Sequence, residues 1–202
     1  YLDTAAFTKN GFQNRNRIRL SNKIDWLTVP ILSKGFYNHP TKEIRINNQV
    51  DWKRKHLLTF RHNYGKYPYY SYVYDFLLNI YAREYHYLVS LNLALLTEIR
   101  KMLGISNKTF LASELNEHGT GTERLISLIK SVGGKSYISG QGAKKYLNDD
   151  LFRKERITLI YQVFSPECIS PATKGSEVPL SILDVMFTLG PKTIDWLIGG
   201  TP

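Results

Sequence analysis

The sequence is poor in cysteine and contains no long apolar run. Its one cysteine, Cys168, excludes an internal disulfide and a zinc site built from several thiolates. No stretch approaches the roughly 18 consecutive apolar residues that a membrane-spanning helix needs, and no signal-peptide pattern opens the chain. These absences predict a cytoplasmic protein. Because the chain begins with Tyr1 rather than Met, we expect a further segment to precede it.

Acidic residues are scarce in the first third of the 202-residue chain. Through Lys66 there are 13 Lys/Arg against 4 Asp/Glu, whereas the rest carries 14 against 13. Almost all of the net charge of +10 therefore lies in the first third. This asymmetry indicates an anionic partner: a nucleic acid, an acidic membrane surface or a phosphorylated small molecule. A merely solubilising basic surface is the alternative.

Composition and residue patterning predict one α/β domain over residues 1–202. Apolar residues make up 43% and charged residues 22%, which is typical of a globular chain rather than a disordered one. Residues 10–22 are too hydrophilic for a core element. Strands are expected at 24–32, 43–47, 108–111, 136–139 and 157–164, with residues 1–3 as the end of another strand. Helices are expected at 51–63, 68–80, 85–103, 123–132, 142–147, 180–189 and 192–198.

Strands and helices alternate after Gly104. This order predicts a mainly parallel, Rossmann-like sheet with helices on both faces, plus a helical insertion around residues 50–103. Residues 165–179 contain three prolines and no periodicity, so we expect an irregular loop there.

Two glycine-containing turns precede predicted helices. Gly119-Thr120-Gly121-Thr122-Glu123-Arg124 could offer backbone N–H groups to an anion, although Thr120 and Glu123 also have the spacing of a capping box. Tyr137-Ile138-Ser139-Gly140-Gln141-Gly142-Ala143 follows a predicted strand, where open parallel sheets bind ligands. A plain tight turn is the alternative for the second segment. We expect the two turns, together with Arg15 and Arg17, to border one pocket.

Histidines and tyrosines give weaker signals. The five histidines show no metal-binding spacing, and His39 and His118 are candidates for proton transfer. Six tyrosines between residues 64 and 74 lie near Arg61 and Lys66. They could stack on bases or a sugar, or simply pack at a domain edge.

Several segments, taken in order, resemble the WbqC-like family of bacterial surface-polysaccharide gene clusters. They are Leu2-Asp3 with Phe7-Thr8-Lys9, Asn14-Arg15-Asn16-Arg17-Ile18, Trp26-Leu27-Thr28-Val29-Pro30, Trp52 with Lys55-His56-Leu57, Ser113-Glu114-Leu115, Gly121-Thr122-Glu123-Arg124-Leu125, Tyr137 to Ala143 with Tyr146-Leu147, and Leu180-Ser181-Ile182-Leu183-Asp184. The resemblance covers nearly the whole chain.

The sequence departs from the family pattern at three places. The family's opening strand and His-Gln-Pro-x-Tyr turn would precede Tyr1. Asp3-Thr4-Ala5-Ala6 stands where the family tends to read Asp-Asp-Val-Gln. The family's His-Pro…Tyr-x-Gln loop is not recognisable in residues 165–179. Altered chemistry is expected if the lost groups are catalytic.

The resemblance implies an enzyme of surface-polysaccharide biosynthesis that transfers an acyl or aminoacyl group to a nucleotide-linked amino sugar, with ATP as a possible cofactor. Arg15 and Arg17 would grip phosphates. The catalytic candidates are Asp184, Glu123 and His118. The remaining candidates for substrate binding are Asp3, Lys9, Asn14, Asn16, Ser113, Glu114, Gly119, Gly121, Thr122, Arg124, Ser139, Gly140, Gly142 and Tyr146. A basic nucleic-acid-binding module and a non-catalytic scaffold of a glycan-assembly complex are the alternatives.

Overall fold

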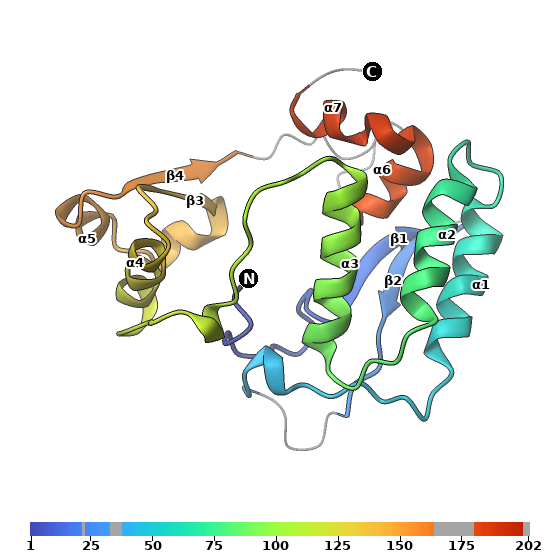
Figure 1. The fold of residues 1–202 in the computed structure, drawn as a ribbon, viewed down its shortest axis with the longest axis horizontal. Coiled ribbons are helices and arrows are strands. Elements are labelled where there is room, and N and C mark those ends of the chain that lie inside the picture. The colour runs from blue at the N-terminus through green and yellow to red at the C-terminus, as the bar shows by residue number, and fades with distance from the viewer. Residues whose placement is uncertain (22, 33–37, 164–179, 200–202) are drawn as a thin grey trace. The chain divides into compact units, whose positions relative to one another are not determined.

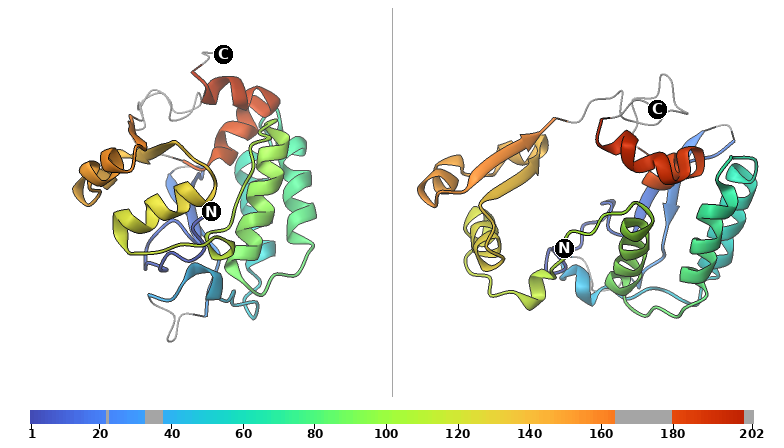
Figure 2. Two further views of the ribbon diagram at one scale, coloured as in Figure 1. Left: turned by 60° about the vertical axis from the view of Figure 1, so that its left-hand side comes forward. Right: turned by 45° about the horizontal axis from the view of Figure 1, so that its top comes forward.

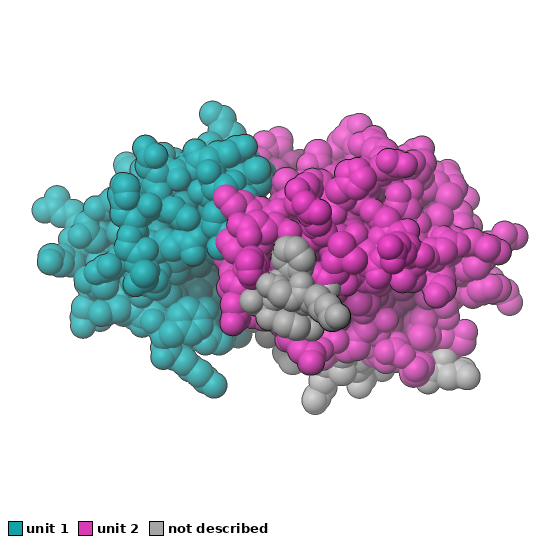
Figure 3. All heavy atoms as spheres, turned by 90° about the horizontal axis from the view of Figure 1, so that it is seen from below, with its two compact units in different colours: residues 1–4, 108–165 teal, residues 5–107, 166–202 magenta. Residues whose placement is uncertain are grey.

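The computed structural model describes residues 1–21, 23–32, 38–163 and 180–199 (Figure 1). The chain divides into two compact units: a smaller unit of residues 1–4 with 108–165, and a larger unit of residues 5–107 with 166–202 (Figure 3). The loop expected at 165–179, and Cys168 with it, lies outside the described residues.

The larger unit combines a β-hairpin with helices. Strands β1 (Arg15–Arg19) and β2 (Ile24–Thr28) pair antiparallel, with Arg17 opposite Trp26. The helices are α1 (Trp52–Tyr64), α2 (Tyr70–Tyr81), α3 (Leu88–Met102), α6 (Ile182–Leu189) and α7 (Thr193–Leu197). The helices expected in this part of the chain are therefore confirmed, with ends that differ by a few residues.

Strand β1 forms where the sequence predicts only a hydrophilic segment. Ile18 is its one fully buried residue and enters the core. Arg15 and Arg17 lie on the opposite face of the strand, because side chains alternate along it, and their guanidinium groups stack on Trp26. The prediction was wrong because arginines with an aromatic partner can occupy the outer face of a strand without burying their charge.

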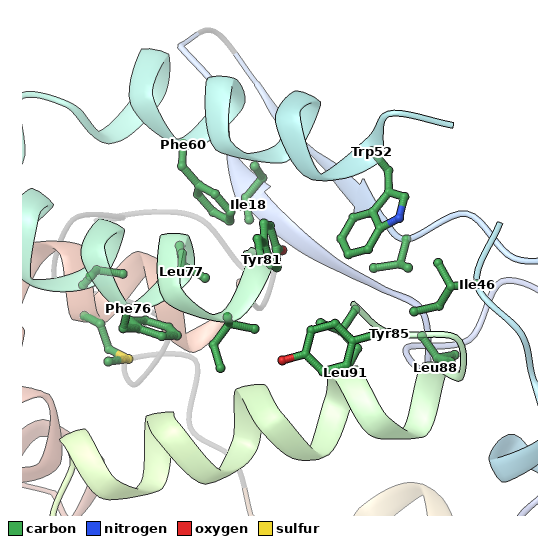
Figure 4. Close-up of a cluster of buried hydrophobic side chains, with 14 of the residues drawn as sticks. Ile18, Ile46, Trp52, Phe60, Phe76, Leu77, Tyr81, Tyr85, Leu88 and Leu91 are labelled. Atoms are coloured by element: carbon green, nitrogen blue, oxygen red, sulfur yellow. The ribbon is translucent and has the colours of Figure 1, made fainter. Parts of the chain in front are cut away.

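The core of the larger unit is built from aromatic and aliphatic residues of α1, α2 and α3 around Ile18 (Figure 4). Trp52, His56, Phe60 and Tyr64 recur every four residues on α1, and all four are buried. The four-residue spacing therefore marks the face of α1 that packs inward.

Two tyrosines in this core differ in their hydrogen bonding. Both rings lie in the core (Figure 4). The Tyr81 hydroxyl lies 3.2 Å from Nδ1 of His56, whereas the buried Tyr85 hydroxyl has no hydrogen-bond partner among the described residues. An unpaired buried hydroxyl is destabilising, because it has lost its water without gaining a partner. We expect Tyr85→Phe to raise the free energy of unfolding by about 1 kcal/mol, and Tyr81→Phe to lower it by about as much, in urea denaturation. A loss of stability in Tyr85→Phe would contradict this.

The smaller unit contains one βαβ crossover. Helix α4 (Gly121–Ser131) precedes strand β3 (Ser136–Gly140), a 3₁₀ helix at Gln141–Lys145, helix α5 (Asp149–Lys154) and strand β4 (Thr158–Gln162). Strands β3 and β4 are parallel, with Ile138 opposite Ile160, and run side by side in both views of Figure 2. The smaller unit has a core of its own, which consists of Ile126, Ile129, Phe152 and Ile157. The predicted parallel pairing of these two strands is confirmed.

The described residues form a mixed α/β structure, but they contain no Rossmann sheet: there are two two-stranded sheets, one antiparallel and one parallel. Residues 108–111 and 1–3 are not strands; only Tyr1 pairs its backbone with residues 110 and 112, too short a stretch to form a ladder. Residues 43–47 form isolated bridges. The expected helix at 142–147 is a 3₁₀ helix, and α5 was not predicted. No described helix has the length and apolar character needed to cross a bilayer.

Candidate functional site

The hairpin of the larger unit carries a face of arginine and aromatic side chains, which we call the arginine–tryptophan face: Phe12, Arg15, Arg17 and Trp26. The guanidinium carbons of Arg15 and Arg17 lie 4.0 and 4.6 Å from the centre of the Trp26 ring. The Phe12 ring is 5.2 Å from Trp26 and 60% exposed. The register of the hairpin produces this arrangement, because Arg17 and Trp26 are cross-strand partners.

The two guanidinium groups of this face have no carboxylate partner among the described residues. Arg15 is held instead by backbone carbonyls: its Nε donates to Gly11 at 3.3 Å and its Nη2 to Asn10 at 2.6 Å. Two cations on one aromatic ring, with N–H donors that bond to no described residue, form a site suited to an anion such as a phosphate.

The other predicted residues near the hairpin have different roles. Asn14 donates from Nδ2 to the carbonyl of Val29 at 2.9 Å and thereby helps to close the base of the hairpin. Asn16 is exposed, and its Oδ1 accepts from the N–H of Arg17. Lys9 is exposed in the preceding turn. Asn16 and Lys9 are thus exposed to solvent, but Asn16 alternates with Arg15 and Arg17 along β1 and so points away from the arginine–tryptophan face, whereas Asn14 is a structural residue.

A polar cluster organises the smaller unit. The buried carboxylate of Asp3 accepts from the N–H of Ser113 at 3.0 Å and from its Oγ at 2.6 Å. Arg124 on α4 grips both carboxylate oxygens of Glu117, at 2.7 and 3.0 Å, and also donates to the Thr4 hydroxyl. Asp3 and Ser113 thus bind each other, while Arg124 binds Glu117, which was not predicted, and Thr4. Glu114, beside Ser113, is exposed.

The turn before α4 does not form the capping box that the sequence allowed. Thr120 precedes the helix but its side chain caps none of the helix N–H groups. Gly121 has a φ of 53°, so the chain enters the helix through a left-handed residue and not in the capping geometry. Gly119, also left-handed, lets Glu123 pack close, and Thr122 Oγ1 accepts from the N–H of Asn148 at 3.0 Å.

Two of the predicted catalytic residues are accessible at this turn. Glu123 and His118 are both exposed, and the backbone N–H of His118 donates to Ser127 Oγ at 3.0 Å. Both side chains are therefore open to solvent, where they can exchange a proton with a substrate.

The second glycine turn is more open. Ser139 is buried in β3, while Gly140 and Gly142 are exposed and would accept a Cβ atom without contact. Tyr146, after the 3₁₀ helix, is 72% exposed. Gln141 Nε2 donates to the carbonyls of Tyr161 and Gln162 on β4, which fixes the turn at the end of the parallel pair.

Asp184 lies at the centre of a buried network in the larger unit. It is fully buried on α6, and its carboxylate accepts from Nε and Nη2 of Arg19, at 3.3 and 3.4 Å, and from the Tyr64 hydroxyl at 3.0 Å. That hydroxyl in turn accepts from the N–H of Arg19 at 2.9 Å. Burial and the adjacent carboxylate raise the pKa of Tyr64, so its proton stays in place. This arrangement ties α1, α6 and β1 together.

The predicted residues thus fall in both units: Arg15 and Arg17 in the larger one, the turns at 119–122 and 139–142 in the smaller one. Their convergence on one pocket stays a prediction.

Comparison with known proteins places these features in a family. A model of the WbqC-like protein family matches residues 1–196. The chain belongs to this family. It is 30% identical over 197 residues to an uncharacterized protein of Mycobacterium tuberculosis, Rv1507c, covering 96% of this chain and 85% of that protein. No solved structure matches the chain at a significant level.

Several of the segments that resemble the WbqC-like family lie together in the smaller unit, and several others lie together in the larger unit. In the smaller unit, Asp3, Ser113 and Arg124 belong to the polar cluster described above. In the larger unit, residues 14–18 and 26–30 form the hairpin, and the N–H of Ser181 donates to the carbonyl of Arg17. Family-like residues therefore support the arginine–tryptophan face from both strands and from the start of α6.

Sequence reasoning missed the aromatic partners of the face and the partners of Asp184. Alternating arginines at 15, 17 and 19 were a strand signal that hydrophilicity hid. Nothing local in the sequence links Arg19 and Tyr64 to Asp184, which lies 165 and 120 residues away from them.

Proposed function

We propose that this protein is an enzyme of bacterial surface-polysaccharide biosynthesis that transfers an acyl or aminoacyl group to a nucleotide-linked amino sugar. Membership of the WbqC-like family supports the biological setting. The observation that carries the substrate class is the pair of guanidinium groups on Trp26.

The arginine–tryptophan face suits a nucleotide diphosphate in three respects. The guanidinium groups of Arg15 and Arg17 form no ion pair among the described residues and can donate in parallel to phosphate oxygens. The exposed ring of Phe12 next to Trp26 offers a surface on which a nucleobase can stack. Because Arg15 is already held by two carbonyls, little side-chain entropy is lost when a phosphate binds.

The proposed transfer forms one bond and breaks another. The amine nitrogen of the sugar attacks the carbonyl carbon of an activated acyl donor, and the donor's leaving group departs with the electron pair of its bond to that carbon. The nitrogen gives up a proton to a base. Asp184 does not take this role, because Arg19 and Tyr64 enclose its carboxylate. The role of the base stays a prediction for Glu123 and His118, which are exposed.

Binding is tested by calorimetric titration with a uridine diphosphate amino sugar at low and moderate salt. We expect Arg15→Lys and Arg17→Lys each to weaken binding about tenfold, because lysine keeps the charge but loses the planar pair of donors. Arg61→Lys, an exposed change on α1, is the matched control and should bind like the parent.

The same titration with a short single strand and a duplex separates the rival function. A small ligand with few charges gives a shallow salt dependence, whereas a polynucleotide releases many counterions and gives a steep one. Tight oligonucleotide binding with a steep salt slope, and no binding of the nucleotide-sugar, would overturn the enzyme in favour of a nucleic-acid-binding module. The transfer itself is tested by incubating the protein with the amino sugar and an activated acyl donor. Mass spectrometry then shows whether the amine has been converted to an amide.

A further inference from the structure

Two adjoining hollows of the larger unit contain none of the residues discussed as site candidates above. The first, of about 600 Å³, is lined by Leu32, Arg45, Ile46, Asn47, Asn48, Gln49, His86 and Tyr87. The second, of about 420 Å³, is lined by residues 48–53 and 84–86. They share Asn48, Gln49 and His86. Both volumes lie in the range of about 300–1,000 Å³ that small-molecule sites occupy.

We propose that these hollows are a binding groove for an oligosaccharide that carries a carboxylate group, with the carboxylate in the first hollow beside Arg45. The proposal is independent of the nucleotide-binding role given to the arginine–tryptophan face, because the two use different residues.

The walls of the groove are built before any ligand arrives. Three extended segments are tied to each other by backbone hydrogen bonds: Leu32 N–H to the Arg45 carbonyl at 3.0 Å, Ile46 N–H to the His86 carbonyl at 2.9 Å, and Asn47 N–H to the Pro30 carbonyl at 2.9 Å. Such fixed walls reduce the entropy that is lost on binding.

The side-chain amides of Asn47, Asn48 and Gln49 have different roles in the groove. Asn48 is part of the frame, because its Nδ2 donates to the Tyr85 carbonyl at 2.8 Å and its Oδ1 accepts from Trp52 Nε1 at 3.2 Å. Within the described parts of the chain, the Asn47 side chain bonds only through its Oδ1, which accepts from the N–H of Gln49, so its amide NH₂ is left as a donor. The exposed amide of Gln49 offers both a donor and an acceptor. Sugar hydroxyls both donate and accept, so amides match them better than charged groups alone.

Charge and ring placement decide where the acidic group lies. Among the described residues, no carboxylate lines the first hollow and Arg45 forms no ion pair. Its guanidinium carbon lies 5.7 Å from the centre of the Tyr87 ring, and both side chains are exposed. A pyranose ring can pack its C–H face on Tyr87 while its carboxylate reaches Arg45. Asp51 and Glu84, in the second hollow, can accept hydrogen bonds from hydroxyls.

The test uses the full chain and two probes with the same sugar rings, one charged and one neutral: trigalacturonic acid and its methyl ester. In NMR titration we expect the acid to bind at least tenfold more tightly than the ester, with shifts at residues 45–49 and 86–87. Arg45→Ala should abolish the difference between the two probes, and Gln49→Ala should weaken both. Arg61→Ala, exposed on α1, is the matched control for charge and should change neither.

Four results would overturn the proposal. The first is the absence of binding of either probe at 10 mM. The second is equal binding of acid and ester by the parent. The third is an unchanged preference in Arg45→Ala. The fourth is inorganic phosphate binding at the same residues as tightly as the trisaccharide, which would make the groove a simple anion site. Arg45 and Gln49 are exposed, so thermal melts are expected to show folded variants.

Discussion

Asp184→Ala is expected to lower the free energy of unfolding by about 3–5 kcal/mol, measured by urea denaturation. The carboxylate is fully buried and accepts hydrogen bonds from Arg19 and Tyr64. Its removal leaves a partly buried guanidinium without its counter-charge and a buried hydroxyl without its acceptor. Both groups have already lost water, so the cost exceeds that of losing an exposed ion pair.

Two further variants separate this role from a catalytic one. Asp195→Ala, an exposed change on α7, should alter stability by less than about 0.5 kcal/mol. Arg19→Met combined with Asp184→Leu should recover much of the loss, because an apolar pair leaves no buried charge uncompensated. If Asp184→Ala keeps the parent's stability and loses only acyl transfer, Asp184 acts on the substrate and the structural role is wrong.

The helices of the larger unit were predictable because their signal is local. Phe60 and Tyr64 of α1, with Trp52 and His56, recur at intervals that place them on one face, and this face is the one that packs inward. The same holds for β3 and β4, whose apolar residues are bounded by turn signals. Strand β2 was predicted within residues 24–32, whereas β1 was not predictable in this way, because Arg15 and Arg17 depend on Trp26 of the partner strand to be placed.

The candidate site shows the same limit. Arginines at 15 and 17 were predicted as anion ligands from charge alone, and the structure adds that Trp26 orients them. Asp184 was predicted as an acid or base in a segment that resembles the family, but its environment is set by residues more than 100 positions away. Long-range contacts of this kind decide whether a titratable group can take part in catalysis or only stabilises the core.

His56 makes the folded state sensitive to moderate acid. Its Nε2 lies 2.9 Å from the carbonyl of Thr28, which can only accept, so Nε2 carries the proton and Nδ1 accepts from the Tyr81 hydroxyl. Burial lowers the pKa of His56 from 6.5 to about 4, and burial also raises the pKa of Tyr81. The imidazole is therefore neutral in the folded protein at pH 6, whereas an unfolded chain would already bind protons there.

The sign of the pH dependence follows from these values. Because the folded-state pKa lies below the unfolded one, the contribution of His56 is fully present above pH 6.5 and is lost as the pH falls toward 4. A pKa difference of this size corresponds to about 3 kcal/mol in total, of which about 2 kcal/mol is lost by pH 5. We expect urea denaturation between pH 7.5 and 5 to show this loss in the parent and in His62→Gln, an exposed change on the same helix. His56→Gln should have a lower stability at pH 7.5 but a flatter profile, since its amide does not titrate. Parallel profiles for the parent and His56→Gln would show that His56 is not the group responsible.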